Sequence, residues 1–426
     1  MLRLSVTGFW KNLGFKKWQL TLTFLSLVFV LIWAFYFINK YSIDLLIEDR
    51  ADWWGFIVNG GGWFEGFFKQ HGPHRLGLLF VLSKFSNLIS PLNLTTDLYI
   101  NAIMMWLTLI LGLRLKWKYT RKWHVSDVVI PLVVLSTFQW EVYIVIPHIH
   151  VMLPFFALLM GNFLISDKKD SLYLTAILFF LAAFSVYAIF AAAPFLLFQI
   201  LRWYKQKAFK KAVIASLIGL ASAVIYLFNF KYGFMNASPG VDWSIAVKGP
   251  YLLALSFLGF NYVFVGAWIS GALILGVMAL FVWKFFKTKN NEVIYFILSS
   301  LSIFIVMQCL GRSHFGEDVF LSTRYYTSMT LFLWIIVLSL KEIPFSKLTQ
   351  GLWLFLLLGT LFRFGDPRWG QQKIYISKVE KWKECYQETL DVEECNARLK
   401  YSVNPNPNKR DLKRTWEIMG QIKRGD

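Results

Sequence analysis

The feature that most constrains this chain is a series of apolar runs long enough to cross the hydrocarbon core of a bilayer. Such a crossing takes about 20 mostly apolar residues in a helix. Of the 426 residues, 57% are hydrophobic and only 16% are charged, whereas soluble proteins carry roughly 25% charged residues. The runs therefore predict an all-α polytopic membrane protein. They exclude a disordered chain, a coiled coil and an ordinary soluble enzyme.

The number of crossings follows from the lengths of the runs. The stretch 171–201 is too long for one crossing and is expected to hold two shorter helices that meet near Ser185. With these two, the sequence predicts about eleven transmembrane helices. The other runs lie at about 19–39, 97–114, 126–146, 148–166, 212–230, 263–283, 292–310, 325–340 and 350–364.

The distribution of charge predicts the orientation. The chain has a net charge of +19, and its Lys and Arg residues cluster beside the apolar runs. Because basic loops stay on the cytoplasmic side, eleven crossings place every cluster inside if the segment 76–92 lies on the outer surface as an interfacial or re-entrant helix. The basic excess is thus a signal of topology, and nucleic acid is not expected as a partner. The clusters lie at 3–17, 114–122, 168–169, 202–211, 284–289 and 341–347.

This topology divides the chain into three parts. Residues 1–18 form a cytoplasmic N-terminus, residues 19–365 form the transmembrane body with its first outer loop at 40–96, and residues 366–426 form a small extracytoplasmic tail. The tail contains Cys385 and Cys395, which could form a disulfide on the oxidising side of the membrane. Ten residues of straight helix would hold them about 15 Å apart, so a bridge requires a turn, expected near Asp391–Glu393.

Polar residues gather in three segments that this topology places outside, at 43–75, 138–150 and 311–326. Five of the six histidines lie there, beside carboxylates and arginines. Loops that were merely polar would spread these residues over both faces of the membrane. Because charges near a membrane are costly and mark functional sites, we interpret the three segments as parts of one site.

The residue types in these segments suit the transfer of a sugar from a polyprenyl phosphate. A carboxylate can act as a general base toward an acceptor hydroxyl. Arginines can hold the departing phosphate through two parallel hydrogen bonds, and tryptophans and tyrosines can stack on sugar rings. Arg312 and Arg324 are the expected phosphate ligands. The alternative is that they pair structurally with Glu317 and Asp318.

The order of these parts resembles a known class of enzymes. One crossing, a large outer loop with acidic residues just past the membrane, surface helices and then many crossings are similar to the GT-C class of membrane glycosyltransferases, which use lipid-phosphate sugar donors. The chain resembles more closely an uncharacterised bacterial family of multipass proteins with H-x-x-H-R, Q-W-E and late G-R…S-R-Y motifs. The matching residues are His71-Gly72-Pro73-His74-Arg75, Gln139-Trp140-Glu141, and Gly311-Arg312 with Thr323-Arg324-Tyr325.

Two departures from the family motifs matter. Gly72-Pro73 stands where Asn-Glu is expected, which removes a carboxylate, and Ser322-Thr323 replaces a single Ser before Arg324-Tyr325. The resemblance still covers most of the membrane body. It implies an inverting, metal-independent transfer, without a cofactor, in the bacterial cytoplasmic membrane. The N-terminus is then inside and the C-terminus outside. The partners it implies are a polyprenyl-phosphate-linked sugar donor and a glycan, lipid or protein acceptor.

The resemblance also implies roles for individual residues. It places the catalytic base in the first loop, and we transfer that role to Glu48, Asp49 or Asp52, with Asp49 preferred because it is central in the acidic run. Arg50 is expected to keep at least one of these carboxylates ionised. The expected substrate-binding residues are His71, His74, Arg75, Glu141, Arg312, His314, Arg324 and Tyr325.

Three alternatives stay open at this point. A polysaccharide polymerase or ligase also acts on polyprenyl-linked glycans, but it would normally carry its large loop late in the chain. A lipid or solute transporter would place charged groups near the bilayer midplane and often shows repeated halves, and no repeat is evident here. A divalent metal ion could be held by His148 and His150 together with His71 or His74.

Overall fold

The computed structural model describes most of the N-terminal half, including most of the first loop, together with parts of the later helices and most of the tail. The described residues are 17–43, 45–46, 50–71, 74–121, 123, 125–137, 139–145, 156, 159–160, 172–185, 189–230, 240–258, 292–317, 320, 371–402 and 409–418. They are mostly helical, as predicted, and include one short β-hairpin that the sequence did not predict.

The elements of the first half are α2 (Lys17–Tyr41), α3 (Arg50–Val58), α4 (Trp63–Phe68), β1 (Gln70–His71), β2 (His74–Arg75), α5 (Leu78–Ile89), α6 (Leu94–Thr120), η1 (Val125–Val128), α7 (Val129–Val134) and α8 (Trp140–Ile144). Those of the second half are α10 (Leu172–Ala183), α11 (Ile189–Lys205), α12 (Phe209–Leu227), α13 (Trp243–Leu258), α15 (Glu292–Arg312), η4 (Ser313–Phe315), α18 (Gln371–Thr389), α19 (Val392–Leu399) and α20 (Lys409–Ile418).

Three helices in the described part of the chain are long and apolar enough to cross a membrane. They span Gln19–Tyr41, Leu94–Lys118 and Phe209–Leu227, and they coincide with three of the predicted runs. The predicted run 292–310 is also a single helix, α15. The runs 263–283, 325–340 and 350–364, and nearly all of 148–166, lie outside the described residues. The count of eleven therefore stays a prediction.

The stretch 171–201 divides as the sequence predicts. Helix α10 ends at Ala183 and α11 begins at Ile189, so the break falls at Ser185. This side chain is completely buried. Its hydroxyl donates to the carbonyl of Leu181 and accepts from the backbone N–H of Leu78 at 3.1 Å. The break between the two helices is therefore a point of attachment for the first loop.

The run 126–146 differs from the prediction of one continuous helix. It consists of η1, α7 and α8, which are separated near residues 135–139. Between these helices, two backbone carbonyls accept hydrogen bonds from side chains. The amide of Gln139 donates to the carbonyl of Val134, and the hydroxyl of Tyr143 donates to the carbonyl of Leu135, both at 2.9 Å. Polar side chains that compete for backbone carbonyls end a helix in this way.

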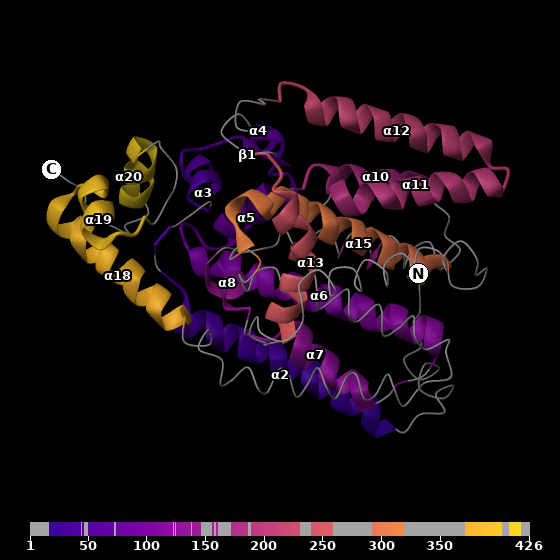
Figure 1. Ribbon diagram of the computed structural model, residues 1–426, viewed down its shortest axis with the longest axis horizontal. Coiled ribbons are helices and arrows are strands. Elements are labelled where there is room, and N and C mark those ends of the chain that lie inside the picture. Colours follow the sequence, from indigo (N-terminus) through magenta and orange to yellow (C-terminus); the bar gives the residue numbers. More distant parts are fainter. Residues whose placement is uncertain are drawn as a thin grey trace.

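Helices α2 and α6 run antiparallel and form the centre of the larger core (Figure 1). Near one end the ring of Phe35 packs on that of Tyr99, with centroids 4.9 Å apart. Farther along, the indole of Trp106 donates to the carbonyl of Leu27 at 3.1 Å. A second core lies among α10, α11 and α12, and α15 packs against α11 and α13.

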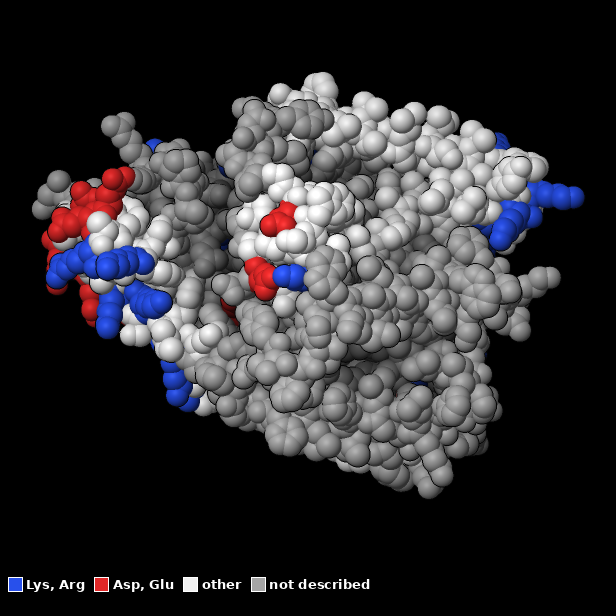
Figure 2. Space-filling view, viewed as in Figure 1, with Lys and Arg blue, Asp and Glu red and all other residues white. Residues whose placement is uncertain are grey.

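Charged side chains are unevenly placed along the long axis of the molecule. Figure 2 shows basic side chains at the end where α11 turns into α12, whereas acidic and basic side chains are mixed over the tail helices at the opposite end. The exposed lysines of that turn are Lys205, Lys207 and Lys210. The basic turn and the tail thus occupy opposite ends of the bundle.

The tail helices α18, α19 and α20 pack on one end of the bundle (Figure 1). Cys385 and Cys395 form a disulfide between α18 and α19, with Cα atoms 5.8 Å apart. The required turn is made at Leu390, which has a φ of 53°, and at Asp391, whose carboxylate caps the N-terminus of α19. The bridge that the sequence allowed is present, and the chain turns at Leu390–Asp391, at the start of the expected segment Asp391–Glu393.

Candidate functional site in the first loop

The first loop is a folded structure between α2 and α6. Helix α3 is followed by α4, the β1–β2 hairpin and α5, and the hairpin pairs Gln70 with Arg75 and His71 with His74. The H-x-x-H spacing thus places the two histidines directly opposite one another in the hairpin. Helix α5 has 12 residues and is about 18 Å long, so it is too short to cross a bilayer as a straight helix. This length agrees with the interfacial or re-entrant helix predicted for 76–92.

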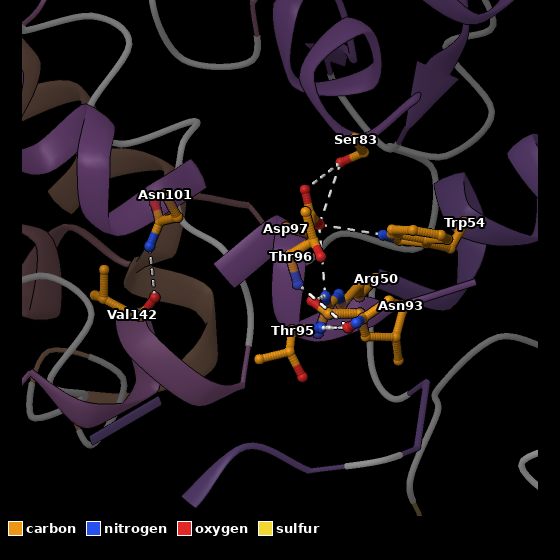
Figure 3. A network of polar contacts seen from close by, with 10 residues as sticks. Arg50, Trp54, Ser83, Asn93, Thr95, Thr96, Asp97, Asn101 and Val142 are labelled. Carbon is orange, nitrogen blue, oxygen red and sulfur yellow. Dashed lines mark hydrogen bonds and ion pairs between the residues drawn. The ribbon is translucent and has the colours of Figure 1, made fainter. Parts of the chain in front are cut away.

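A buried ion pair joins the loop to the first turn of α6 (Figure 3). The guanidinium of Arg50, at the start of α3, lies 3.5 Å from the carboxylate of Asp97. That carboxylate also accepts hydrogen bonds from the indole of Trp54 at 3.1 Å and from the hydroxyl of Ser83 at 3.1 and 3.3 Å. Arg50 donates in addition to the carbonyl of Leu94. One carboxylate therefore connects α3, α5 and α6.

Burial makes this cluster an anchor. Arg50 is 1% exposed and Asp97 is completely buried. Loss of water lowers the pKa of Arg50 to about 10, although the charge of Asp97 opposes the shift, so the guanidinium stays charged at neutral pH. Both oxygens of Asp97 are already bonded to loop residues, which leaves the group poorly suited to accept a proton from a substrate. We assign the pair a structural role.

The N-terminus of α6 is specified by its own sequence. The side chain of Asn93 accepts hydrogen bonds from the backbone N–H groups of Thr95 and Thr96 (Figure 3), as expected for an N-cap residue. One turn beyond Asp97, the amide of Asn101 donates to the carbonyl of Val142 at 2.7 Å. The same end of α6 thus holds the first loop and α8, the helix that begins with Trp140 and Glu141.

Arg75 caps the end of another helix. Its guanidinium donates to the carbonyl of Tyr226 at 2.9 and 3.0 Å and also to the carbonyls of Phe228 and Phe68. Tyr226 lies in the last turn of α12 and Phe228 directly follows the helix, where carbonyls lack helical partners. Burial lowers the pKa of Arg75, but backbone carbonyls compensate the charge. In this structure Arg75 ties the hairpin to α12, and its predicted contact with substrate stays a prediction.

The residue two positions later makes a third attachment. Gly77 has a φ of 51°, and a Cβ atom there would lie 1.8 Å from the carbonyl oxygen of Phe184. No other residue type fits this combination of a left-handed backbone and a close approach to a second backbone. Arg75 and Gly77 therefore fix the hairpin against α12 and against the break between α10 and α11.

Aromatic and basic side chains also contact one another within the loop. The rings of Trp53 and His71 meet edge to face, with centroids 6.0 Å apart. The ammonium of Lys84 donates to the carbonyl of Gly61 and lies 5.0 Å from the ring centroid of Trp63. Trp63 and Phe64 are exposed. An exposed aromatic pair beside a lysine is typical of a surface that meets lipid headgroups.

The late segment presents its charges at a helix end. Arg312 is the last residue of α15, and both Arg312 and His314 are half-buried. Burial and the nearby charge of Arg312 lower the pKa of His314. Glu317, one proposed partner for the arginines, forms an ion pair with Lys248 of α13 at 2.7 Å. The hydroxyl of Ser313 accepts from the backbone N–H of Asp242.

The predicted site residues are therefore only partly located. Asp52 lies in the first turn of α3, and Glu141 lies in the first turn of α8 and is half-buried. His71 and His74 lie in the hairpin. Outside the described residues lie Glu48, Asp49, Asp318, Arg324 and Tyr325, and also the histidines His148 and His150.

Sequence reasoning missed the partner of Arg50. The guanidinium was expected to keep a carboxylate of its own acidic run ionised, which stays a prediction because Glu48 and Asp49 lie outside the described residues. Its ion pair with Asp97, 47 positions later, was not expected. A signal was present, because Asp97 is an acidic residue at the edge of an apolar run and such residues are seldom left without a partner. Ser83 and Trp54 carry no comparable signal, since their role depends on how α3 and α5 pack.

Comparisons with known proteins add no relative to this description. No protein-family model, curated protein or solved structure matches the chain. Among the described residues, no group of three or more His, Cys, Asp or Glu side chains is placed to hold a metal ion.

Proposed function

We propose that this protein is a GT-C-like membrane glycosyltransferase that transfers a sugar from a polyprenyl-phosphate-linked donor to a glycan, lipid or protein acceptor. The observation that carries the proposal is the folded first loop. Its acidic run leads into α3, whose first turn contains Asp52 and which is fixed to α6 through Arg50 and Asp97. A base can be effective only if it is held in position, and this anchoring supplies that condition.

The roles of the residues follow the same logic. Glu48, Asp49 or Asp52 would accept the proton of the acceptor hydroxyl, with Asp49 preferred. Arg312 and Arg324 would neutralise the departing phosphate, while His71, His74, Glu141, His314 and Tyr325 would contact the sugars. Because the guanidinium of Arg75 already binds three carbonyls, its contribution to binding would be to position the hairpin.

The placement of buried charges favours this proposal over a transporter. In α6, Asp97 lies in the first turn and Lys116 lies in the last two turns, paired with Asp127. Both charges thus lie toward the ends of the helix, whereas transporters bind their cargo near the bilayer midplane. In the described spans, the first loop therefore lies at one end and the basic turn between α11 and α12 lies at the other.

The orientation that suits the proposal places the first loop and the tail on the outer face of a bacterial cytoplasmic membrane. The basic turn at Lys205–Lys210 then faces the cytoplasm, as the positive-inside rule requires. The disulfide between Cys385 and Cys395 is stable on the oxidising outer side. Labelling of a cysteine introduced at Gln371 with a membrane-impermeant maleimide in intact cells should succeed, and failure would reverse the orientation.

The direct test is mass spectrometry of lipid-linked and surface glycans in a deletion strain complemented with single variants. Glu48→Gln, Asp49→Asn and Asp52→Asn remove each candidate base in turn, and loss of the base should lower transfer roughly 10²–10⁴-fold. The matched control is Glu65→Gln, which changes an exposed carboxylate in α4 of the same loop. Near-normal transfer in all three variants would remove the acidic run from catalysis, and unchanged glycans in the deletion strain would reject the proposal.

A further inference from the structure

The tail contacts the first loop on both sides of the acidic run. On one side, the indole N–H of Trp416 donates to the carbonyl of Leu46 at 2.8 Å, and both residues are completely buried. On the other side, α20 packs along α3, and a Cβ atom on Gly55 would lie 3.2 Å from the hydroxyl of Thr415. Trp416 and Thr415 are neighbours in α20. This one helix therefore contacts Leu46 before the acidic run and Gly55 after it.

The remainder of the tail holds Trp416 in place. Its ring meets those of Trp382 and Tyr386, with centroids 5.2 and 5.8 Å away. Tyr386 is the neighbour of Cys385, which is bridged to Cys395 in α19. The disulfide therefore fixes α19 to α18, the helix whose Trp382 and Tyr386 rings contact Trp416. The core of the tail is continuous with the larger core of the membrane body.

The acidic run is thus bounded by two attachments. Toward the bundle, α3 is held by the ion pair between Arg50 and Asp97. Toward the tail, α3 packs against α20, and Leu46 accepts the hydrogen bond from Trp416. Figure 1 shows α20 beside α3, at the end of the molecule away from the basic turn.

We infer that Trp416 is a positioning residue for the first loop, which acts through its hydrogen bond to Leu46 and the packing of α20 on α3. The consequence for turnover rests on the proposed function, because it requires the acidic run to contain the base. The effect on the order of α3 does not depend on any reaction. The two parts can therefore be tested separately.

The first experiment measures hydrogen–deuterium exchange of the full chain in detergent micelles, followed by peptides that cover residues 50–58. Trp416→Phe keeps an aromatic ring but removes the donor to Leu46, and it should speed exchange in α3 by roughly fivefold. Gly55→Leu places a large side chain of α3 against Thr415 of α20, and it should have a larger effect. Replacing both cysteines, Cys385→Ser and Cys395→Ser, should act in the same direction as Trp416→Phe.

The matched control is Glu388→Gln. It removes an exposed ion pair to Arg398 within the tail, at 3.5 Å, and keeps the rings that pack on Trp416 and the bond to Leu46. Exchange in α3 should stay close to that of the wild type. If Glu388→Gln speeds α3 as much as Trp416→Phe does, or if neither Trp416→Phe nor Gly55→Leu speeds it, the inference is wrong.

The second experiment measures transfer by purified protein with polyprenyl phosphate glucose, galactose and mannose as donor probes and cell-envelope glycan as acceptor. A displaced base should lower kcat of Trp416→Phe roughly tenfold without a comparable change in the KM for the donor. Faster exchange in α3 with an unchanged kcat would overturn the positioning role. If the wild type transfers none of these sugars, the proposed function loses support, and the exchange experiment still decides whether α20 holds the loop.

Discussion

The first loop and the late segment contain the same types of residue but use them differently. In the first loop, Arg50 and Arg75 are 1% and 7% exposed, and their donors are directed at Asp97 and at backbone carbonyls. In the late segment, Arg312 and His314 are half-buried at the end of α15. An arginine beside a membrane is therefore not by itself a ligand for phosphate, because the fold can consume its hydrogen-bonding capacity.

The difference has a physical origin in the length of the two segments. The first loop runs from the end of α2 to the start of α6 and has to be attached to helices that are distant in the sequence. Arg50, Arg75 and Gly77 make those attachments, to α6, to α12 and to the break between α10 and α11. The late segment begins within the last turn of α15 and continues into the short helix η4, so its described part is positioned by the helix that carries it.

The largest effect is expected from breaking the buried ion pair. Asp97→Asn keeps the shape of the side chain but leaves the charge of Arg50 without compensation, which should cost roughly 3–5 kcal/mol of stability. Thermal unfolding in detergent micelles, followed by tryptophan fluorescence, measures this loss. The double variant Arg50→Met/Asp97→Asn removes both charges and should recover much of it.

A matched control for this prediction is the ion pair between Arg398 and Glu388 in the tail. It has the same separation of 3.5 Å, but its side chains are 59% and 66% exposed. Glu388→Gln should barely change the unfolding temperature, because water screens exposed pairs. An equal loss in Asp97→Asn and Glu388→Gln would show that the first-loop pair is not an anchor.

A somewhat smaller effect is expected at the glycine that attaches the hairpin. Gly77→Ala adds a Cβ atom against the carbonyl of Phe184 and strains a left-handed backbone, so we expect a loss of about 2–4 kcal/mol. Gly60 also has a positive φ, of 83°, but no atom lies within 4 Å of its added Cβ. Gly60→Ala should therefore lose only the conformational part, about 1 kcal/mol. Equal unfolding temperatures for the two variants would contradict the proposed close approach.

The comparison between the two segments is sharpest in a pair of conservative substitutions. Arg75→Lys keeps the charge but loses the fork that binds three carbonyls, and it should lower stability by about 1–3 kcal/mol. Arg312→Lys keeps the charge but loses the bidentate fork, and it should lower glycan transfer because its proposed target is the donor phosphate. The reverse pattern, with transfer sensitive only to Arg75→Lys, would exchange the roles of the two arginines.

The smallest effect concerns pH. Burial and Arg312 lower the pKa of His314 below its ordinary value of 6.5, so the unfolded chain binds this proton more readily than the folded protein. The contribution of His314 to stability should therefore be unaffected above that value and should decline as the pH falls through it. The measurement is the unfolding temperature from about pH 5 to about pH 8, a range that brackets the ordinary pKa of histidine. The wild type should show this decline, and His314→Gln should show less of it. An equally steep decline in the variant would assign it to another group.

Much of the coarse architecture could be predicted from the sequence. Three of the apolar runs, the break near Ser185 and the possible disulfide depend on local spacing and composition, and the described residues contain each of them. The continuous helix predicted for 126–146 was wrong, because Gln139 and Tyr143 bind the carbonyls that another helical turn would use. Local hydropathy does not report that competition.

The sequence by itself determined that the chain is mostly helical, that it has membrane-spanning candidates and that its charged residues concentrate between them. Only the tertiary structure decided which of those charges have partners. Asp97 meets Arg50, Arg75 meets the end of α12, and Trp416 meets Leu46 from 370 positions away. Hydrophobic periodicity acts over a few helical turns, whereas a buried charge or an indole N–H is satisfied by whichever group the packing of distant helices brings within hydrogen-bonding distance.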